Sequence, residues 1–353
     1  MTYRSCVKIQ RFFLNLAWRI DTGEKCIRFC TEPLTDTPGV PLQNTAEESL
    51  KSIAKLRTAI IAESKTLTMF GRQVADEERN LTSECAKCSN AELKDWGESD
   101  GLIHYVNMSM EPAPCQCRCF YCDVKKKTVD MQQCDEGYEK VFDLINFALR
   151  KELIAADAKW QVSSNEITIH PYRERIFDII KGRSCNFYTN CFIYDEGIAE
   201  NLAENPRSTI NLSIDCGTPE TWFRVKGVDN FDTVRENLAK YSGISLHPEQ
   251  ITLKYIVFPG INDDLGEYRA LAAIMKELKV SRMTISCDLR GGRNKYSVDK
   301  AQREPLIRAA GRLAAVLYSD GLTVRMSENG FFPDEALRVE EIATELIESG
   351  KVS

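Results

Sequence analysis

The alternation of strand-like and helical segments after residue 100 constrains the fold of this chain most strongly. Short runs of β-branched and aromatic residues alternate with stretches whose apolar residues recur every three or four positions. The expected strands are residues 103–110, 167–169, 187–189, 209–214, 251–258 and 282–287, and the expected helices are residues 138–149, 176–181, 198–204, 231–241, 265–278 and 301–317. This order predicts parallel strands joined by helical crossovers, that is, an α/β fold with a partial (βα)6 barrel. In such sheets the chemistry lies at the C-terminal ends of the strands.

The 353 residues are enough for about two domains. We expect a small N-terminal cysteine-rich module at residues 1–100, a core domain at residues 101–330 and a C-terminal helix within residues 331–353. In the first hundred residues, Thr45 and Glu48 form a capping-box pattern, which predicts a helix that runs to about residue 64. The rest of this segment shows no clean alternation of strand and helix.

Charge and hydropathy exclude several classes of protein. The formal net charge is −6, and a dedicated nucleic-acid-binding protein usually shows a basic balance or patch. There is no run of 18 apolar residues, so the sequence predicts no membrane span. The N-terminus shows no convincing signal peptide, so we expect a cytosolic (cytoplasmic) chain with no nucleic-acid or membrane partner.

The 14 cysteines are more than packing needs, and they are clustered. In a reduced compartment, clustered cysteines indicate metal or redox chemistry rather than disulfides. The densest group is Cys115-x3-Cys119-x2-Cys122, which directly follows the first expected core strand. Three thiolates can hold three irons of a 4Fe–4S cluster and leave the fourth iron open for chemistry. The alternative is a zinc knuckle completed by Cys117 and Cys134.

This triplet, with Tyr121 just before its last cysteine, resembles the signature of the radical S-adenosylmethionine (radical SAM) enzymes. The resemblance implies that SAM chelates the free iron and that its reductive cleavage yields a 5′-deoxyadenosyl radical, which abstracts a hydrogen atom from substrate. It also implies a reducing partner such as flavodoxin or ferredoxin. The family pattern does not use the position of Cys117, which we interpret as a non-ligand.

Four further segments in the same order are similar to motifs of that family. Ser164-Asn165-Glu166 stands where the family commonly has Gly-Gly-Glu, and Thr189-Asn190-Cys191 stands where it has Thr-Asn-Gly. Residues 213–221 and 254–263 resemble its fourth-strand and fifth-strand motifs. The resemblance implies cofactor contacts from Tyr121, Glu166, Asn190, Ser213, Asp215 and Phe258: Glu166 for the SAM ammonium, Ser213 and Asp215 for its ribose or carboxylate or for substrate, and Phe258 beside the adenine.

Two cysteine pairs lie in the N-terminal segment, Cys26-x3-Cys30 and Cys85-x2-Cys88. Two such pairs can enclose a metal site. They resemble the SPASM/twitch modules, which usually follow a radical SAM core and here precede it. The resemblance implies an auxiliary 4Fe–4S cluster on these four cysteines. A structural zinc site, or replacement of one ligand by Cys6, remains open.

Cys216 and Cys287 lie near the ends of the fourth and sixth expected strands, where a thiol could donate a hydrogen atom to a substrate radical. The alternative is that both are small buried residues. We expect a carbohydrate or small polar metabolite as substrate, which is epimerised or dehydrogenated. A maturase of a ribosomally made peptide and a non-catalytic zinc or iron–sulfur redox sensor are the other interpretations. A polar SAM methyltransferase would need a Gly-rich turn between residues 110 and 122, and there is none.

Overall fold

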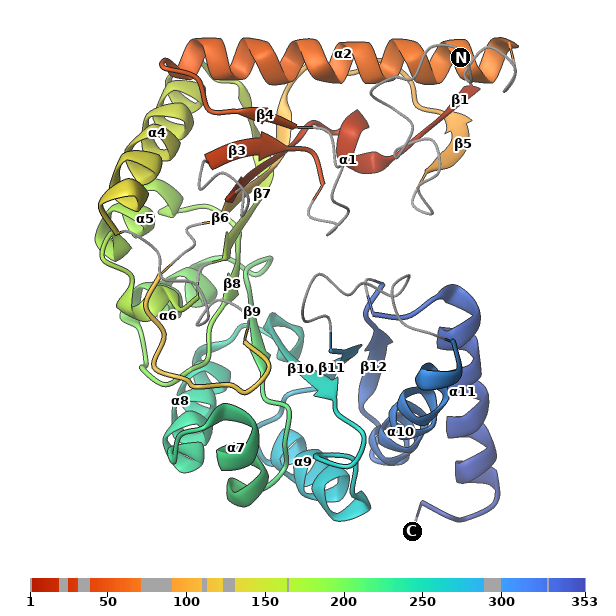
Figure 1. The fold of residues 1–353 in the computed structure, drawn as a ribbon. Helices are drawn as coiled ribbons and strands as arrows, with labels where there is room; N and C mark the ends of the chain where they lie inside the picture. Colours follow the sequence, from red (N-terminus) through yellow and green to blue (C-terminus); the bar gives the residue numbers. More distant parts are fainter. Residues whose placement is uncertain are drawn as a thin grey trace. The chain divides into compact units, whose positions relative to one another are not determined.

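The computed structural model describes residues 2–18, 25–30, 39–70, 91–109, 113–122, 131–163, 165–288, 300–328 and 330–352. The chain forms two compact units (Figure 1). The first unit comprises Met1–Pro112 and Val129–Ser164, and the second comprises Ala113–Thr128 and Asn165–Ser353. The segments 101–112 and 129–164, which we expected in the core domain, therefore cluster with the N-terminal segment.

The first unit contains strands that the sequence did not predict. Its elements are β1 (Thr2–Ser5), α1 (Val7–Gln10), β2 (Phe13–Trp18), β3 (Lys25–Arg28), β4 (Gly39–Pro41), α2 (Ala46–Phe70), β5 (Glu92–Asp95), β6 (Ile103–Ser109), α4 (Met131–Arg150) and β7 (Ile154–Ser163). Strands β7, β6, β2, β3 and β4 follow one another in a sheet, and β1 pairs with β5. Strand β2 is parallel to β6, which explains why the first core strand clusters with the N-terminal segment.

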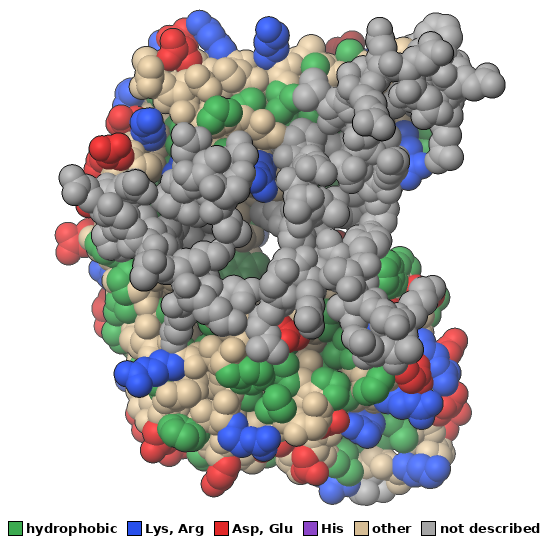
Figure 2. Space-filling model, in the orientation of Figure 1, with side chains coloured by type: hydrophobic (Ala, Val, Ile, Leu, Met, Phe, Trp, Pro, Cys, Tyr) green, Lys and Arg blue, Asp and Glu red, His purple; other side chains and the backbone are tan. Residues whose placement is uncertain are grey.

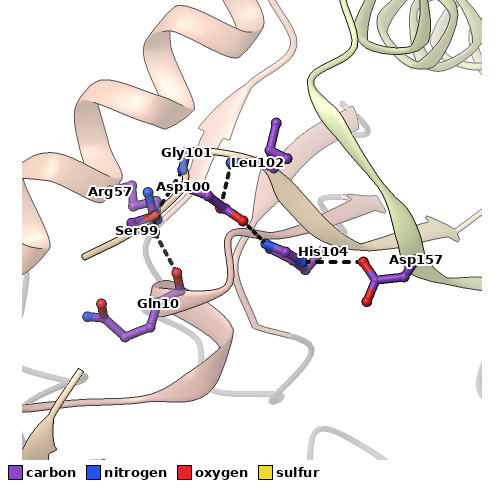
Figure 3. A network of polar contacts seen from close by, with 8 residues as sticks. All are labelled: Gln10, Arg57, Ser99, Asp100, Gly101, Leu102, His104 and Asp157. Carbon is purple, nitrogen blue, oxygen red and sulfur yellow. Dashed lines mark hydrogen bonds and ion pairs between the residues drawn. The ribbon is translucent and has the colours of Figure 1, made fainter. Parts of the chain in front are cut away.

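Helix α2 is anchored by its cap and by one buried arginine. The Thr45 hydroxyl accepts a hydrogen bond from the Glu48 backbone at 3.2 Å, as the capping pattern predicted, although the helix continues to Phe70. The buried Arg57 guanidinium donates to the Gln10 carbonyl at 2.6 Å and to the Ser99 hydroxyl at 2.8 Å (Figure 3).

The same polar network continues toward β6. Asp100 accepts from the Leu102 backbone at 3.0 Å, and its other carboxylate oxygen lies 2.8 Å from Nε2 of His104 (Figure 3). Asp157, on β7, lies 4.0 Å from the second ring nitrogen of His104. These contacts hold the segment before β6 against the rest of the first unit.

The second unit follows the predicted alternation closely. Its elements are η3 (Ile167–Ile169), α5 (Arg173–Ile180), β8 (Cys185–Tyr188), α6 (Glu196–Glu204), β9 (Thr209–Ser213), α7 (Pro219–Lys226), α8 (Phe231–Ile244), η4 (Pro248–Gln250), β10 (Ile251–Val257), α9 (Leu265–Glu277), β11 (Arg282–Cys287), α10 (Lys300–Ser319), β12 (Thr323–Met326) and α11 (Pro333–Glu348). Strands β8 to β12 lie in sequence order and are parallel where they pair. This mostly parallel α/β arrangement is consistent with the expected partial barrel.

One expected strand is wrong, and two elements were missed. Residues 167–169 form the 3-10 turn η3 rather than a strand, because the Glu166 side chain caps this turn by accepting from the Thr168 backbone at 3.0 Å. Helix α7 and strand β12 were not predicted. Thr218 caps α7, Pro219 occupies its first turn, and Gly227 ends it in the left-handed conformation.

The two faces of the second unit's sheet differ in polarity. One face packs against helices, and its side chains are buried: Phe187, Ile210, Leu212, Leu253, Tyr255, Met283, Ile285 and Val324. Contacts such as the edge-on meeting of the Tyr255 and Tyr268 rings join it to α9. The alternate residues point to the opposite face, as strand geometry requires, and are mostly polar: Asn186, Thr209, Asn211, Ser213, Thr252, Lys254, Arg282, Thr284, Ser286 and Arg325. We call this opposite face the open face.

Candidate functional site

The cysteine loop at residues 113–122 belongs to the second unit and is tied to helix α7. The Arg118 amide donates to the Lys226 carbonyl at 2.7 Å, and the Phe120 amide donates to the Val225 carbonyl at 3.2 Å. Gly227 has a φ of +70°, and a Cβ atom there would lie 2.7 Å from the Arg118 carbonyl oxygen. Glycine at this position therefore permits both the helix end and the close approach of the loop.

Aromatic rings form a support beneath the last part of the loop. The Phe258 ring lies 4.9 Å from that of Phe120 and 5.2 Å from that of Tyr121, measured between centroids. The three rings pack with Val225, Ile256 and Ile261. Phe258 follows β10 directly, so the apolar C-terminal end of this strand packs against the loop. The predicted adenine contact of Phe258 stays a prediction.

A buried polar cluster fixes the same loop from the side. Asp215 is fully buried, and its carboxylate forms an ion pair with Lys226, which is 3% exposed. Tyr121 donates its hydroxyl proton to Asp215 at 2.7 Å, and the Lys226 ammonium donates to the Tyr121 oxygen at 2.8 Å. The other Asp215 oxygen accepts from the Ile256 amide at 2.7 Å. We call Tyr121, Asp215 and Lys226 the loop clamp.

The clamp was only partly visible in the sequence. Lys226 was not singled out, because its two partners lie 11 and 105 positions away along the chain. Burial alone would lower the pKa of Lys226, but the negative charges of Asp215 and Cys119 outweigh it and hold the pKa above its ordinary value. Burial and the adjacent Asp215 raise the pKa of Tyr121, which therefore stays a hydrogen-bond donor.

The three predicted cluster ligands lie half-buried on the loop, and Cys117 lies buried between them. Hydrogen bonding from the Cys117 thiol lowers the pKa of Cys115 to about 7 and that of Cys119 to about 6. Both groups are thus biased toward the thiolate, the form that ligates metal. Hydrogen bonding to both neighbours raises the pKa of Cys117, which suits the predicted non-ligand. The sulfur ligands of this loop, and the tendency of Cys115 and Cys119 to ionise to thiolates, therefore fit a 4Fe–4S cluster.

Within the described part of the chain, no three His, Cys, Asp or Glu side chains gather closely enough to hold a single metal ion. An iron–sulfur cluster makes a different demand, since its cysteines bind separate irons.

Asn190 and Glu166 connect the loop after β8 to the cysteine loop. The Asn190 amide nitrogen Nδ2 lies 3.1 Å from Gln116 Oε1 and 3.6 Å from Cys115 Sγ. Glu166 is fully buried, and its carboxylate accepts hydrogen bonds from the backbone amide of Asn190 at 2.7 Å and from the Thr189 hydroxyl at 2.8 Å. Together with two bonds from Thr168, these donors occupy the carboxylate, while burial raises its pKa. Glu166 thus orients the Asn190 segment.

Ser213 and the two candidate hydrogen donors occupy different environments. Ser213 is half-buried at the end of β9, on the open face. Cys216 is fully buried, and Cys287 is 5% exposed with its thiol donating to the Gly330 carbonyl at 3.2 Å. Cys287 also alternates with Met283 and Ile285 and so lies on the face that packs against helices. Both thiols are thus buried, as in the alternative interpretation, and their role as hydrogen donors stays a prediction.

The structure describes half of the expected auxiliary site. Cys26 is buried on β3, and Cys30 is half-buried two residues after that strand. The Lys8 ammonium donates to the Cys30 sulfur at 3.3 Å. Cys85 and Cys88 lie outside the described residues, so the four-cysteine site stays a prediction.

The surface and the helices add two observations. On the face drawn in Figure 2, Lys and Arg side chains are interspersed with Asp and Glu side chains over the described residues. In the described ranges, every helix is too short or too polar to cross a membrane.

Part of the chain is similar to a known protein family. Residues 114–272 match the Radical SAM superfamily model. A curated relative, the UPF0026 protein of Helicobacter pylori, is 20% identical over 229 residues, which are 63% of this chain and 70% of that protein. A crystal structure of Streptococcus suis SuiB bound to S-adenosylmethionine aligns with a TM-score of 0.47 and 12% identity over 64% of this chain and 50% of that chain.

SuiB bound to its precursor peptide SuiA aligns with a TM-score of 0.46 and 11% identity, over 92% of this chain and 72% of that chain. The chain thus spans about half the length of the SAM-bound SuiB chain. The matched segment begins at Pro114 and contains the cysteine loop, Glu166, Asn190 and the loop clamp. Residues 114–272, which hold most of the candidate site, are thus similar to the Radical SAM superfamily.

Proposed function

We propose that this chain is a radical SAM enzyme that uses the 5′-deoxyadenosyl radical to abstract a hydrogen atom from a C–H bond of a carbohydrate or other small polar metabolite, with epimerisation or dehydrogenation as the outcome. The observation that carries the proposal is the position of the cysteine loop. It lies against the C-terminal ends of β9 and β10 through the loop clamp, in the same unit as the polar open face.

Cys115, Cys119 and Cys122 would hold a 4Fe–4S cluster that leaves one iron for SAM. When bound, this cluster supplies the electron that cleaves SAM, and the protein supplies placement. We assign the direct SAM contacts to Asn190, whose side chain reaches the cysteine loop, and to Ser213, which ends β9 on the open face.

The two buried carboxylates receive a different role in the proposal. The buried Glu166 carboxylate already accepts several hydrogen bonds from its own unit, and so does that of Asp215. We therefore propose that both act as positioning residues: Glu166 orients Asn190, and Asp215 orients Tyr121 and the cysteine loop.

The open face supports a polar substrate. Apart from Ile256, the side chains on this face of β8 to β11 are amides, hydroxyls and two cations, whereas an apolar substrate would require the opposite lining. We retain the auxiliary 4Fe–4S cluster on Cys26, Cys30, Cys85 and Cys88 as part of the proposal, with a reducing protein such as flavodoxin or ferredoxin as electron donor.

The test is anaerobic SAM cleavage. The protein is reconstituted with iron and sulfide, reduced with dithionite and given SAM, and 5′-deoxyadenosine is measured by mass spectrometry. We expect cleavage by the wild type and by Cys185→Ala, a matched loss of one buried thiol on the helix-packed face of β8. We expect none from the variant with alanine at positions 115, 119 and 122. Cleavage by that triple variant would overturn the assignment of the loop.

A further inference from the structure

Polar side chains at paired positions of neighbouring strands form a row across the open face. The strand register pairs Ser213 on β9 with Lys254 on β10, Lys254 with Thr284 on β11, and Thr284 with Arg325 on β12. Paired residues of parallel strands point to the same face, and neighbouring strands lie about 4.8 Å apart. Lys254 therefore stands between two hydroxyl groups, with a second cation two strands away.

Lys254 has no counterion of its own among the described residues. It is half-buried, and in the part of the chain that the structure describes its ammonium makes neither a hydrogen bond nor an ion pair. The charge of Asp215 acts on it, but the Asp215 carboxylate is already bonded to Lys226 and Tyr121. Burial lowers the pKa of Lys254. A partly desolvated ammonium without a partner costs free energy, which an anionic ligand would recover.

Two positions further along β11, the same face carries the Ser286 hydroxyl, which has no hydrogen-bond partner among the described residues. Ser286 is paired with Ile256 across the strands and is buried. It follows Thr284 by two positions and so lies on the same face, toward the C-terminal end of β11. By contrast, Thr209 on β9 has a partner on β8: its hydroxyl donates to the Asn186 side chain at 2.8 Å.

We propose that Lys254, Thr284 and Ser286 form a binding site for an oxyanion of the substrate, either a carboxylate or a phosphate ester. One cation with two adjacent hydroxyl donors matches the needs of such a group. The site lies one strand away from Ser213, to which SAM binding was assigned, and so can hold the substrate beside the cofactor. This inference rests on the proposed function and specifies its substrate as anionic.

The test uses inorganic phosphate and acetate as probes for the two oxyanion chemistries. Their binding to reconstituted holoenzyme is measured by calorimetry at constant ionic strength. We expect at least one probe to bind the wild type and Lys254→Arg, and to bind Lys254→Gln about tenfold more weakly or worse. Lys276→Gln is the matched control, because Lys276 is an exposed lysine on α9 paired with Asp320.

Three outcomes of the binding measurements would overturn the inference. The first is that neither probe binds the wild type; the second is that both bind Lys254→Gln as well as they bind the wild type. The third is that Lys254→Gln weakens SAM binding as much as probe binding, which would assign Lys254 to the SAM carboxylate. The probe that binds more tightly identifies the oxyanion class.

Two further measurements keep this test independent of the proposed function and of folding. Formation of 5′-deoxyadenosine is measured on the same samples: its absence from the wild type counts against the proposed function, whereas its presence without probe binding counts against the oxyanion site alone. Lys254→Met should raise the thermal midpoint of the iron-free protein, since it removes an unpaired, partly buried charge. A lowered midpoint would show a structural role and overturn the inference.

Discussion

Replacement of Lys226 by methionine should destabilise the iron-free protein, because it leaves the Asp215 carboxylate buried without its cation. Removing one partner of a buried ion pair costs about 3–5 kcal/mol. Asp215 keeps two donors, the Tyr121 hydroxyl and the Ile256 amide, so we expect the lower end, about 3 kcal/mol. For a cooperative unit of this size, that loss corresponds to a fall in thermal midpoint of roughly 6–12 °C.

Urea unfolding at pH 7.5, followed by circular dichroism, measures this loss for Lys226→Met, Asp215→Asn and the double variant. The double variant removes both charges, so it should be clearly more stable than the sum of the single losses predicts. Lys276→Met is the matched control: it breaks an exposed ion pair and should cost at most about 1 kcal/mol.

The pH dependence of this effect has a definite sign. The pKa of Lys226 in the folded protein is above its ordinary value, so its contribution is complete below that ordinary value and is lost only as the pH rises through the folded pKa. The difference between wild type and Lys226→Met should therefore be constant from neutral to moderately alkaline pH. A loss no larger than that of the control, or additive single losses, would refute the reasoning.

Three more perturbations test other parts of the account. Cys117→Ala should shift the pH midpoint of Cys119 alkylation upward from about 6, since it removes the hydrogen bond that favours the thiolate. Rates of iodoacetamide modification, followed by mass spectrometry as a function of pH, measure this midpoint, and an unchanged midpoint contradicts the prediction. Gly227→Ala should lower the amount of iron bound after reconstitution and lower the free energy of unfolding by about 1–3 kcal/mol, because φ is +70° and the new Cβ would meet the cysteine loop. The control, Gly243→Ala, has open space around it and should be neutral or stabilising. Arg57→Met removes the donor of the Gln10 carbonyl and one of the two donors of the Ile9 carbonyl, and should cost about 1–3 kcal/mol, seen as faster hydrogen exchange in the first unit but not in the second.

The helices and strands of the second unit were predictable because their signals are local. Strand β10 alternates in burial, and helix α9 repeats its apolar residues at helical spacing. The error at residues 167–169 arose because Ile-Thr-Ile has strand-forming side chains, while the cap from Glu166 determines the turn. The strands before residue 100 are short and depend on distant partners, such as β1 on β5, so no local pattern indicates them.

The candidate site divides in the same way. The spacing of Cys115, Cys119 and Cys122 is a local pattern and could be recognised from the sequence alone. The role of Lys226 and the hydrogen bonds of Glu166 and Asp215 could not, because they depend on contacts between segments far apart in the chain. One local signal for Lys226 existed: it ends a helix directly before a glycine, where a cation is favoured.

The most direct test of the central claim is the electron paramagnetic resonance spectrum of the reconstituted, dithionite-reduced protein, recorded with and without SAM. The account predicts a reduced 4Fe–4S signal that SAM changes, because one iron is left free by Cys115, Cys119 and Cys122. The variant with alanine at these three positions should lose the SAM-sensitive signal. A wild-type spectrum that SAM leaves unchanged, or zinc in place of iron on the loop, would contradict the account.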